Sequence, residues 1–412
     1  MIPAQERKNN SITVILLIFA GVVIYALSGG IRANFGIIIQ PLTQSSGIDY
    51  ASISFVLGIS QLLYGYTQPL WGALAMKRSG TFVLLCGIPL MAAGLIITAF
   101  THSSAVLMLS LGIMVGAGAG ALCFGIIMGA ISPVLGPAYA AAASGVLNAG
   151  SGIGSAALSP AIQAVSAASG IRTALLLLAV PFLFLIPVTI WIGKMSSASP
   201  AGAEMHADDA PAAKPAGSLE MLRTAVRTAD YRRLMAGFST CGFHMIIVQT
   251  HMVSYFISLG CTAARAALIY TAYGICAMIG AIISGLLCTR FHLKNVLGSL
   301  YGVRVIAVAL FLFAAPKNPM TMLLFALIMG LSGNATVTPT SEIISRRFGV
   351  RAMAFLFGIT FACHQTGAFL SSSLGGIFID KLGNYELIWI LDIVLCALAS
   401  LVSFRIRVAE GE

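Results

Sequence analysis

The sequence predicts an all-α membrane protein whose twelve transmembrane helices form two six-helix halves. Three observations support this prediction: the composition, the length and number of the apolar runs, and one polar break near the middle of the chain. Of the 412 residues, 58% are hydrophobic and 9% are charged, and the mean hydropathy is +0.96. Soluble domains carry about a quarter charged residues, so this composition excludes a soluble enzyme or binding domain.

The first six apolar runs are each long enough to cross a bilayer, whose hydrocarbon core takes about 20 helical residues. They predict helices near residues 12–35, 51–74, 81–100, 105–130, 138–166 and 171–193. The first run is too long for the core of a signal peptide and lacks an Ala-x-Ala cleavage site, so we expect it to be retained as a helix. Together the six runs predict an N-terminal half over residues 1–193.

A polar break follows at residues 194–230, which we predict to be a cytoplasmic linker. Residues 195–217 contain almost no bulky apolar side chains, a composition typical of flexible linkers. In residues 218–230, Leu219, Leu222 and Val226 recur at helical spacing. This pattern predicts either an interfacial helix on the inner membrane surface or a cytoplasmic extension of the next transmembrane helix.

The second six apolar runs predict helices near residues 231–259, 264–288, 295–315, 319–342, 350–377 and 385–405. They define a C-terminal half over residues 231–412. A weak internal repeat supports the two halves, because Gly72, Gly145 and Gly154 are each followed by another glycine 213 residues further on. Parallel repeats of this kind, with the substrate between them near the midplane, are the layout of the major facilitator superfamily.

The lysine and arginine residues are distributed unevenly between the predicted loops. With the N-terminus inside, the inner segments carry most of the 23 Lys and Arg, and the outer loops carry only Arg172, Arg265, Lys317 and Lys381. Because cytoplasmic loops are the basic ones, we expect both termini in the cytoplasm and a multi-pass protein of a bacterial inner membrane. The formal charge of +10 results from this bias and is no argument for a nucleic-acid partner.

Signals of catalysis or metal binding are missing from the sequence. The eight cysteines show no Cys-x-x-Cys or Cys/His ligand spacing, so we expect packing residues, no metal and no cofactor. No ATPase signature of the Gly-x-x-x-x-Gly-Lys-Ser/Thr kind is present. An intramembrane enzyme would need a nucleophile and base or a metal constellation, and no spacing predicts one. We therefore expect no enzyme, and a gradient as the energy source.

Arg32 is the main candidate binding residue, because a fixed cation within an apolar run needs a partner or a purpose. A mid-membrane arginine costs roughly 2.5 to 3.5 kcal/mol on insertion scales, and such residues usually face the bundle interior or a water-filled cavity. Arg32 therefore predicts an anion site. The alternative is that its side chain extends from the helix end to the outer headgroups.

Other polar residues in the predicted helices form stripes. Gln61, Tyr64 and Gln68 share one face of helix 2, and Asn148 lies on a similar stripe of helix 5 with Ser151 and Ser155. They are candidates for lining the cavity. The alternative is interhelical packing through hydrogen bonds of about 0.6 kcal/mol each.

Ionisable residues in the C-terminal half are candidates for proton coupling. His364 in helix 11 and His251 in helix 7 can titrate near neutral pH, as can His244, for which a packing role is the stronger alternative. Asp392 in helix 12 must be neutral or paired, and Arg304 in helix 9 is one candidate partner. Arg304 is otherwise a structural residue or a second cation.

Three parts of the sequence carry more specific patterns. They are residues 31–36 (IRANFG) with Pro41, residues 68–72 (QPLWG), and the run 355–359 (FLFGI) followed by 364–367 (HQTG) and 375–383 (GGIFIDKLG). These parts resemble the monocarboxylate and oxalate:formate antiporter branch of the major facilitator superfamily. The resemblance covers nearly the whole chain outside the linker. It implies transport of a small organic anion.

The chain also departs from that branch. Relatives of known substrate usually have a basic residue within helix 8, and oxalate carriers add one in helix 11. Here helix 8 has Tyr270, Tyr273 and no internal charge, and helix 11 offers His364. The helix 4 arginine and the helix 5 Gly-Pro pair typical of drug:proton antiporters are missing as well, which makes drug efflux less favoured.

We therefore expect a secondary active transporter of a small organic anion, a monocarboxylate by resemblance, that works by alternating access. Arg32 is expected to neutralise the carboxylate, while His364, Gln365 and His251 bind its other polar atoms. One of the histidines is expected to take a co-transported proton, and Asp392 is a further candidate. The alternatives are efflux of an amphipathic metabolite or drug, and a non-transporting membrane sensor.

Overall fold

The computed structural model describes the backbone of residues 4–198, 215–348 and 350–407. Within these ranges, the side chains of residues 4–11, 136–142, 144, 148, 198, 215–219 and 350–354 lie outside the description. All regular elements of the described chain are helices. Most of the predicted linker, residues 199–214, is likewise outside the described part.

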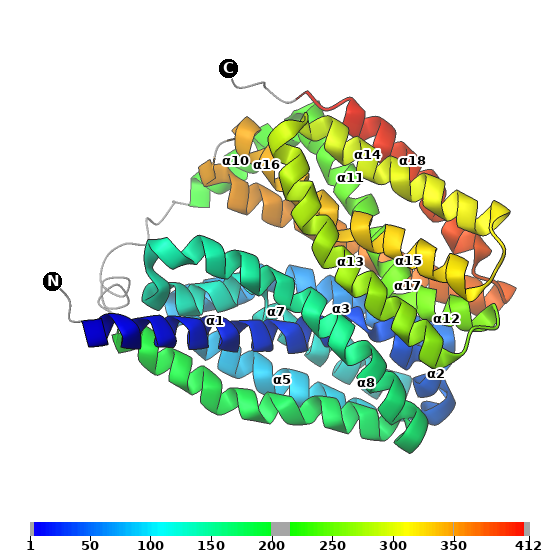
Figure 1. Ribbon diagram of the computed structural model, residues 1–412, viewed down its shortest axis with the longest axis horizontal. Coiled ribbons are helices and arrows are strands. Elements are labelled where there is room, and N and C mark those ends of the chain that lie inside the picture. Colours follow the sequence, from blue (N-terminus) through cyan, green and yellow to red (C-terminus); the bar gives the residue numbers. More distant parts are fainter. Residues whose placement is uncertain (1–3, 199–214, 349, 408–412) are drawn as a thin grey trace.

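The N-terminal half is built from helices α1 to α8. Their bounds are α1 Ala4–Ala33, α2 Phe35–Ser46, α3 Tyr50–Tyr66, α4 Gln68–Lys77, α5 Gly80–Phe100, α6 Ser104–Leu107, η1 Met108–Met114, α7 Val115–Ala121 and α8 Phe124–Ala198. The predicted helix over 51–74 is interrupted at Thr67, between α3 and α4. Because α8 has 75 residues, it would be about 110 Å long if straight. The chain reverses direction at Gly170, whose φ is 81°. Helix α8 therefore runs along the length of the molecule more than once (Figure 1).

The C-terminal half runs from α10 to α18. The bounds are α10 Pro215–Arg227, α11 Ala229–Ile246, η2 Ile247–His251, α12 Met252–Ser258, α13 Ala263–Arg290, α14 Leu293–Ala309, η3 Leu310–Ala314, α15 Pro319–Gly333, η4 Asn334–Thr336, α16 Val337–Phe348, α17 Val350–Leu382 and α18 Glu386–Phe404. Thr228 caps the N-terminus of α11 by accepting from the Tyr231 N–H, so α10 is a separate helix rather than an extension of α11.

The predicted all-α membrane fold is confirmed. Eight helical stretches of the described chain are long and apolar enough to cross a membrane. The stretch from Gly145 to Ser197 has 53 residues and makes two crossings, since one needs about 20. Three more segments are long enough to cross. Two are helices with an internal interruption, α3 with α4 and α11 with α12, and the third is α17, which has 33 residues. These segments correspond to the twelve predicted helices.

The two halves lie side by side, with the first turn of α1 and the last turn of α18 at one end of the molecule (Figure 1). We call this end the terminal end, and the opposite end, where α2 and α12 lie, the loop end. Across the halves, α3 packs against α17 and α8 packs against α13. Hydrogen bonds between the halves gather toward the loop end: the Ser372 hydroxyl donates to the Ser54 carbonyl at 2.6 Å, and the Ser159 hydroxyl donates to the Ala267 carbonyl at 2.8 Å.

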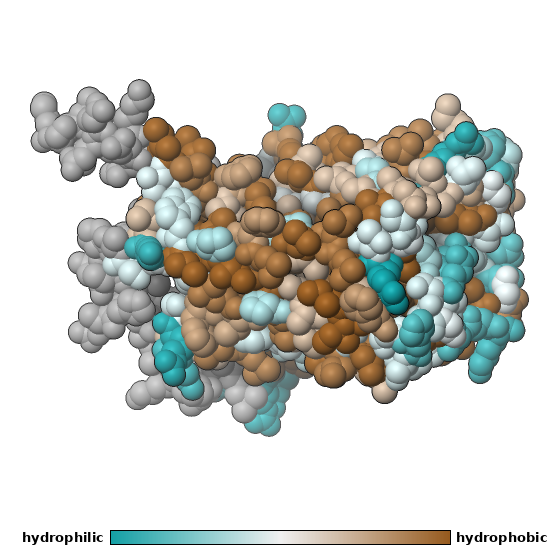
Figure 2. Space-filling view, turned by 90° about the horizontal axis from the view of Figure 1, so that it is seen from below, coloured by the Kyte–Doolittle hydropathy of each residue, from teal (hydrophilic) through white to brown (hydrophobic). Residues whose placement is uncertain are grey.

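The surface carries an apolar belt. Large hydrophobic side chains such as Phe19, Phe184, Leu286 and Phe313 are exposed, and Figure 2 shows apolar residues gathered across the middle of one face, with hydrophilic residues nearer its two ends. Such a large exposed apolar surface is what lipid contact requires. The protein is therefore a multi-pass membrane protein.

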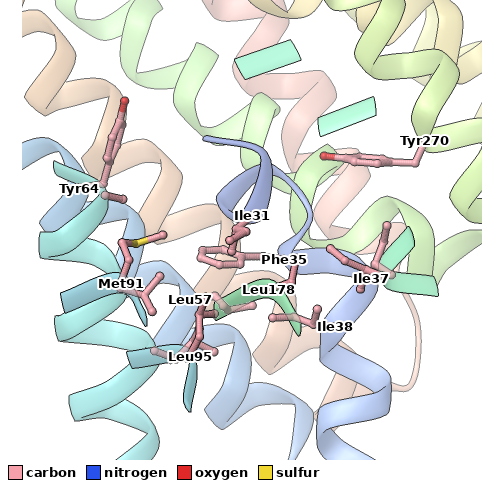
Figure 3. Packing of buried hydrophobic residues seen from close by; sticks show 14 of the residues in the cluster. Ile31, Phe35, Ile37, Ile38, Leu57, Tyr64, Met91, Leu95, Leu178 and Tyr270 are labelled. Carbon is pink, nitrogen blue, oxygen red and sulfur yellow. The ribbon is translucent and has the colours of Figure 1, made fainter. Parts of the chain in front are cut away.

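The last turns of α1 are positioned by close contact with α8, at a place where both helices have glycine. A Cβ atom at Gly30 would lie 2.6 Å from the backbone of Gly154 in α8, so glycine lets the two helices touch. Asn34 then interrupts the helix, and its side-chain amide donates to the Gly30 carbonyl at 2.8 Å and to the Ser155 carbonyl at 3.1 Å. Figure 3 shows Ile31 and Phe35 from this junction among the buried apolar residues of the N-terminal half.

Candidate functional site

Arg32 lies in the last turn of α1 and is held by α3. Its Nη1 donates to Gln61 Oε1 at 2.5 Å, and its guanidinium lies 3.7 Å from the centre of the Tyr64 ring. Gln61 and Tyr64 are three residues apart, so they share the helix face that the sequence stripe predicted. Because α3 holds the charged group against an amide and an aromatic ring, the geometry does not support extension to the headgroups.

Arg32 has no carboxylate partner in the described part of the chain. The ion pairs found there involve Asp230 with Arg233 and Arg347, Glu342 with Arg346, and Asp392 with His244. Its only side-chain hydrogen bond among the described residues is to a neutral amide, and its buried Nε has no partner there. Arg32 is thus a half-buried cation whose charge no described carboxylate compensates.

His364 and Gln365 of α17 lie opposite α3. The His364 ring stacks on Phe361 with 5.4 Å between ring centres and 8° between planes, and its buried Nδ1 has no partner among the described atoms. The Gln365 side chain packs where a Cβ of Gly65 would be, and its buried Oε1 is also unpartnered in the described structure. Phe361 in turn packs against Tyr64, the ring that Arg32 lies over, with 6.1 Å between ring centres, so the structure brings these predicted residues together across the two halves.

His251 lies in the contact between the halves at the loop end. Its Nδ1 is 2.9 Å from the Tyr50 hydroxyl of α3, and its Nε2 is 3.3 Å from the Ser372 carbonyl of α17. Since a carbonyl only accepts, Nε2 carries the proton and Nδ1 accepts from Tyr50 in the neutral ring. Both nitrogens are therefore engaged, and neither is free for a substrate in this conformation.

The remaining candidates lie elsewhere. His244, Asp392 and Arg304 form a second buried group within the C-terminal half, and Asp392 is bound by His244 at 2.8 Å, where the sequence offered Arg304 as a partner. The guanidinium of Arg304 instead donates to the carbonyls of Ser332 and Gly333, at 2.6 and 2.9 Å. The side chain of Asn148 lies outside the described part of the structure.

Sequence reasoning missed several residues that contact the site. Tyr25 interacts with Tyr64 through their side chains, and it precedes Arg32 by seven residues, a spacing that puts both on one face of α1. Tyr270 of α13 donates to the Ala33 carbonyl, and Figure 3 shows it and Tyr64 on either side of the α1–α2 junction. The seven-residue spacing could have predicted that Tyr25 lies on the same face of α1 as Arg32. No local sequence pattern could have predicted that Tyr270 contacts Ala33.

Two carboxylates meet where the halves join at the loop end. Asp380 at the end of α17 accepts from the Ala51 N–H of α3 at 2.8 Å, and Asp49 accepts from the Ser52 N–H and hydroxyl at 2.7 Å each. Partial burial and the nearby Asp49 raise the pKa of Asp380, whereas the Ser52 hydroxyl lowers the pKa of Asp49. The neighbouring titratable groups are Tyr50 and Tyr385, with Lys381 next in the chain.

We expect acidification to stabilise the closed loop end. A raised pKa means that the contact favours protonated Asp380, so its contribution is present in acid and is lost as the pH rises through the raised pKa, above the ordinary value of 3.8. Spin labels at the exposed positions Gln44 and Leu382, in a background without native cysteines, should report more separation as the pH rises. Asp380→Asn should remove this response, and Lys381→Gln should keep it. An unchanged response in Asp380→Asn would contradict the expectation.

The family model described as Major Facilitator Superfamily matches residues 21–270 and 256–412. A protein named Monocarboxylate transporter 12 from Mus musculus is 24% identical over 86% of this chain and 76% of its own length. A Bacillus subtilis (strain 168) protein named Uncharacterized MFS-type transporter YcxA is 27% identical over 41% of this chain, which spans 42% of that protein.

Solved structures show the same fold. A mutant of the nucleoside transporter NupG has a TM-score of 0.77 at 14% identity, covering 95% of this chain and 99% of that one. A bacterial homologue of the human lysosomal transporter Spinster, described as inward-facing and occupied, has a TM-score of 0.75 at 13% identity, covering 94% and 95%. At these identities the likeness concerns the arrangement of helices alone.

Proposed function

Because this chain belongs to the major facilitator superfamily, we propose that it is a secondary active transporter of a small organic anion, a monocarboxylate, that works by alternating access. The membership and the multi-pass helical fold make it a membrane transporter. The substrate class is our inference from the site. The Mus musculus relative, by its name a monocarboxylate transporter, is in accord with it.

The observation that carries the proposal is the uncompensated charge of Arg32. A guanidinium pairs with a carboxylate through two parallel hydrogen bonds, and the Nε of Arg32 is buried and unpartnered in the described structure. Gln61 and Tyr64 fix the orientation of the guanidinium. A single uncompensated cation is best matched by a single negative charge, which favours a monocarboxylate over a dicarboxylate.

Residues of both halves would complete the binding site. In this proposal His364 and Gln365, whose Nδ1 and Oε1 are unpartnered in the described chain, bind the other polar atoms of the substrate. His251 would join them only after the loop end opens and frees it from Tyr50 and Ser372. A gradient supplies the energy, with a co-transported proton as the coupling ion.

We further propose that both termini are cytoplasmic in a bacterial inner membrane, since the basic residues gather at the terminal end. The closed loop end then faces outward. In this orientation the conformation is inward-facing, and the substrate reaches Arg32 from the cytoplasmic side.

A second candidate, efflux of an amphipathic metabolite or drug, is favoured by one observation. A cavity of about 370 Å³ lies between α8 and α13, at the contact of the two halves, and is lined by Gly152, Ile153, Ala156, Ala157, Ile275 and Met278. These residues are apolar, so the cavity suits a hydrocarbon group and offers no charge to an anion.

A thermal-unfolding screen of the purified protein separates the two candidates. Formate, acetate, lactate and pyruvate should each be compared with the corresponding amide, which has the same shape but no charge. Binding to the folded state stabilises it by about 2.7 kcal/mol at a concentration of 100 times Kd, so we expect a carboxylate to raise Tm and its amide to leave Tm unchanged. Stabilisation by amphipathic cations alone, with no response to any carboxylate, would reject the anion proposal in favour of efflux.

A further inference from the structure

The C-terminal half contains an ionisable cluster that the proposed anion site does not use. His244 of α11, Arg304 of α14 and Asp392 of α18 are each at most 1% exposed. His244 Nδ1 lies 2.8 Å from Asp392 Oδ2, and the Cys396 thiol contacts Asp392 Oδ1 at 3.6 Å. The other His244 nitrogen, Nε2, is buried without a partner among the described atoms. Such buried groups are expensive in a membrane protein and usually functional.

The distance between His244 and Asp392 fits a shared proton better than a shared metal ion. His244, Asp392 and Cys396 have the atom types of metal ligands and lie within 4.8 Å of one another. Nitrogen and oxygen ligands of tetrahedral zinc, however, lie about 3.3 Å apart, given bonds of about 2.0–2.1 Å. At 2.8 Å the two atoms are instead at hydrogen-bond distance.

The charged groups of the anion site and of this cluster have an informative sum. Arg32 and Arg304 are always cationic, and Asp392 as a carboxylate beside neutral His244 makes the total +1. A bound monoanion lowers this total to zero. A proton added to the His244–Asp392 pair then restores +1, which is the value of the empty protein. The anion therefore lowers the electrostatic cost of adding the proton.

His364 lies where the fields of the two arginines overlap. Both Arg32 and Arg304 act electrostatically on it, and Arg304 also acts on His244. His364 and Arg304 therefore connect the substrate site to the buried pair, and charges interact strongly through low-dielectric protein without direct contact. Arg304 and Cys396 are the ionisable groups that interact with the pair directly. The ionisable groups around Arg304 are Tyr301, Cys241, Tyr273 and His364.

We propose that the His244–Asp392 pair is the binding site of the co-transported proton and that anion binding at Arg32 promotes its occupation. This inference rests on the proposed function. Because a carboxylate only accepts, the Nδ1–H of neutral His244 already donates to Asp392 Oδ2 in the empty pair. The added proton comes from the aqueous phase and binds at the unpartnered Nε2, which gives an imidazolium–carboxylate pair, or an imidazole–carboxylic acid pair when the Nδ1 proton moves to Oδ2. One anion and one proton then cross together, with no change in the summed charge of Arg32, Arg304 and the pair.

The test compares exchange with accumulation in proteoliposomes, using labelled formate, acetate, lactate and pyruvate as probes. In the wild type, a pH gradient should drive accumulation, and unlabelled carboxylate inside should drive exchange. Asp392→Asn keeps the shape and a hydrogen bond to His244 but removes the charge. We expect this variant to exchange within about twofold of the wild type and to lose at least about tenfold of its gradient-driven accumulation. A matched control is Cys396→Ala, which contacts the same carboxylate and should keep both activities.

A binding measurement gives a second readout. In detergent, the wild type should take up one proton from weakly buffered solution for each carboxylate bound, and Asp392→Asn should take up none. If Asp392→Asn does not fold, His244→Gln should be measured in its place, and it too should take up no proton. Unchanged accumulation and proton uptake in a folded variant would overturn the inference, and so would loss of exchange together with accumulation, which indicates a structural role. Failure of the wild type to exchange any probe would instead count against the proposed function.

Discussion

Arg32→Lys should lose carboxylate binding and transport although it keeps the positive charge. A lysine ammonium is a point charge that cannot donate the two parallel hydrogen bonds of a guanidinium, and it cannot reach Gln61 Oε1 while lying over the Tyr64 ring as Arg32 does. Truncating one partner of a buried charge pair costs about 2–5 kcal/mol, or roughly 30-fold to several thousand-fold in affinity. We expect Arg32→Ala at the upper end of this range and Arg32→Lys at the lower end.

Binding should be measured by thermal shift and transport by uptake into proteoliposomes at equal protein content. Gln61→Ala is a useful companion, because it leaves the charge but removes the residue that orients it, and a smaller loss is expected. Folding of the Arg32 variants should be intact, since the guanidinium satisfies no carboxylate in the described chain. Wild-type uptake by Arg32→Lys would show that only a charge near the headgroups is needed and would exclude the anion site.

Gly242→Ala should strongly destabilise the C-terminal half. A methyl group there would collide with the backbone carbonyl of His364 in α17, and backbone atoms cannot rotate away. Helices α11 and α17 pack closely along this line, and overpacking typically costs about 1–3 kcal/mol. Because His364 belongs to the candidate site, separation of the helices should also weaken carboxylate binding.

Gly358→Ala is the matched control for this change, since it makes the same substitution on α17 at a position with open space within 4 Å. Thermal unfolding in detergent should show a lower Tm for Gly242→Ala and little change for Gly358→Ala. Equal Tm values for the two variants would mean that α11 and α17 are not in tight contact at Gly242.

Much of the architecture could be predicted from the sequence, because hydrophobic length and the break between the halves are local properties. The stripe of Gln61 and Tyr64 was also predictable, since helical spacing alone puts them on one face. Their contact with Arg32 was not, because the rotation of α1 depends on its close packing on α8, such as that of Gly30 on Gly154.

Long-range partners were the least predictable part. Arg304 was a candidate partner for Asp392, but α11 presents His244 to that carboxylate, and Arg304 turns to the carbonyls at the end of α15. Those carbonyls are free because α15 ends at Gly333 and gives way to η4, a break that an apolar run does not reveal. His251 was placed near the substrate because of its chemistry, but only the fold shows its partners Tyr50 and Ser372.

The hydrogen bonds that close the loop end constrain the amino-acid sequence differently on their two sides. Several of them have a main-chain atom as one partner: Asp380 accepts from the Ala51 N–H, Ser372 donates to the Ser54 carbonyl, and Ser159 donates to the Ala267 carbonyl. Every residue supplies a carbonyl, and every residue except proline supplies an N–H. The backbone-contributing positions can therefore drift among homologues without loss of closure, whereas the other member of each bond is under selection. Descendants of this chain should retain the closing residue on only one side of each of these main-chain contacts, so that correlated substitution would reveal the side-chain pair of Tyr50 and His251 but not these contacts.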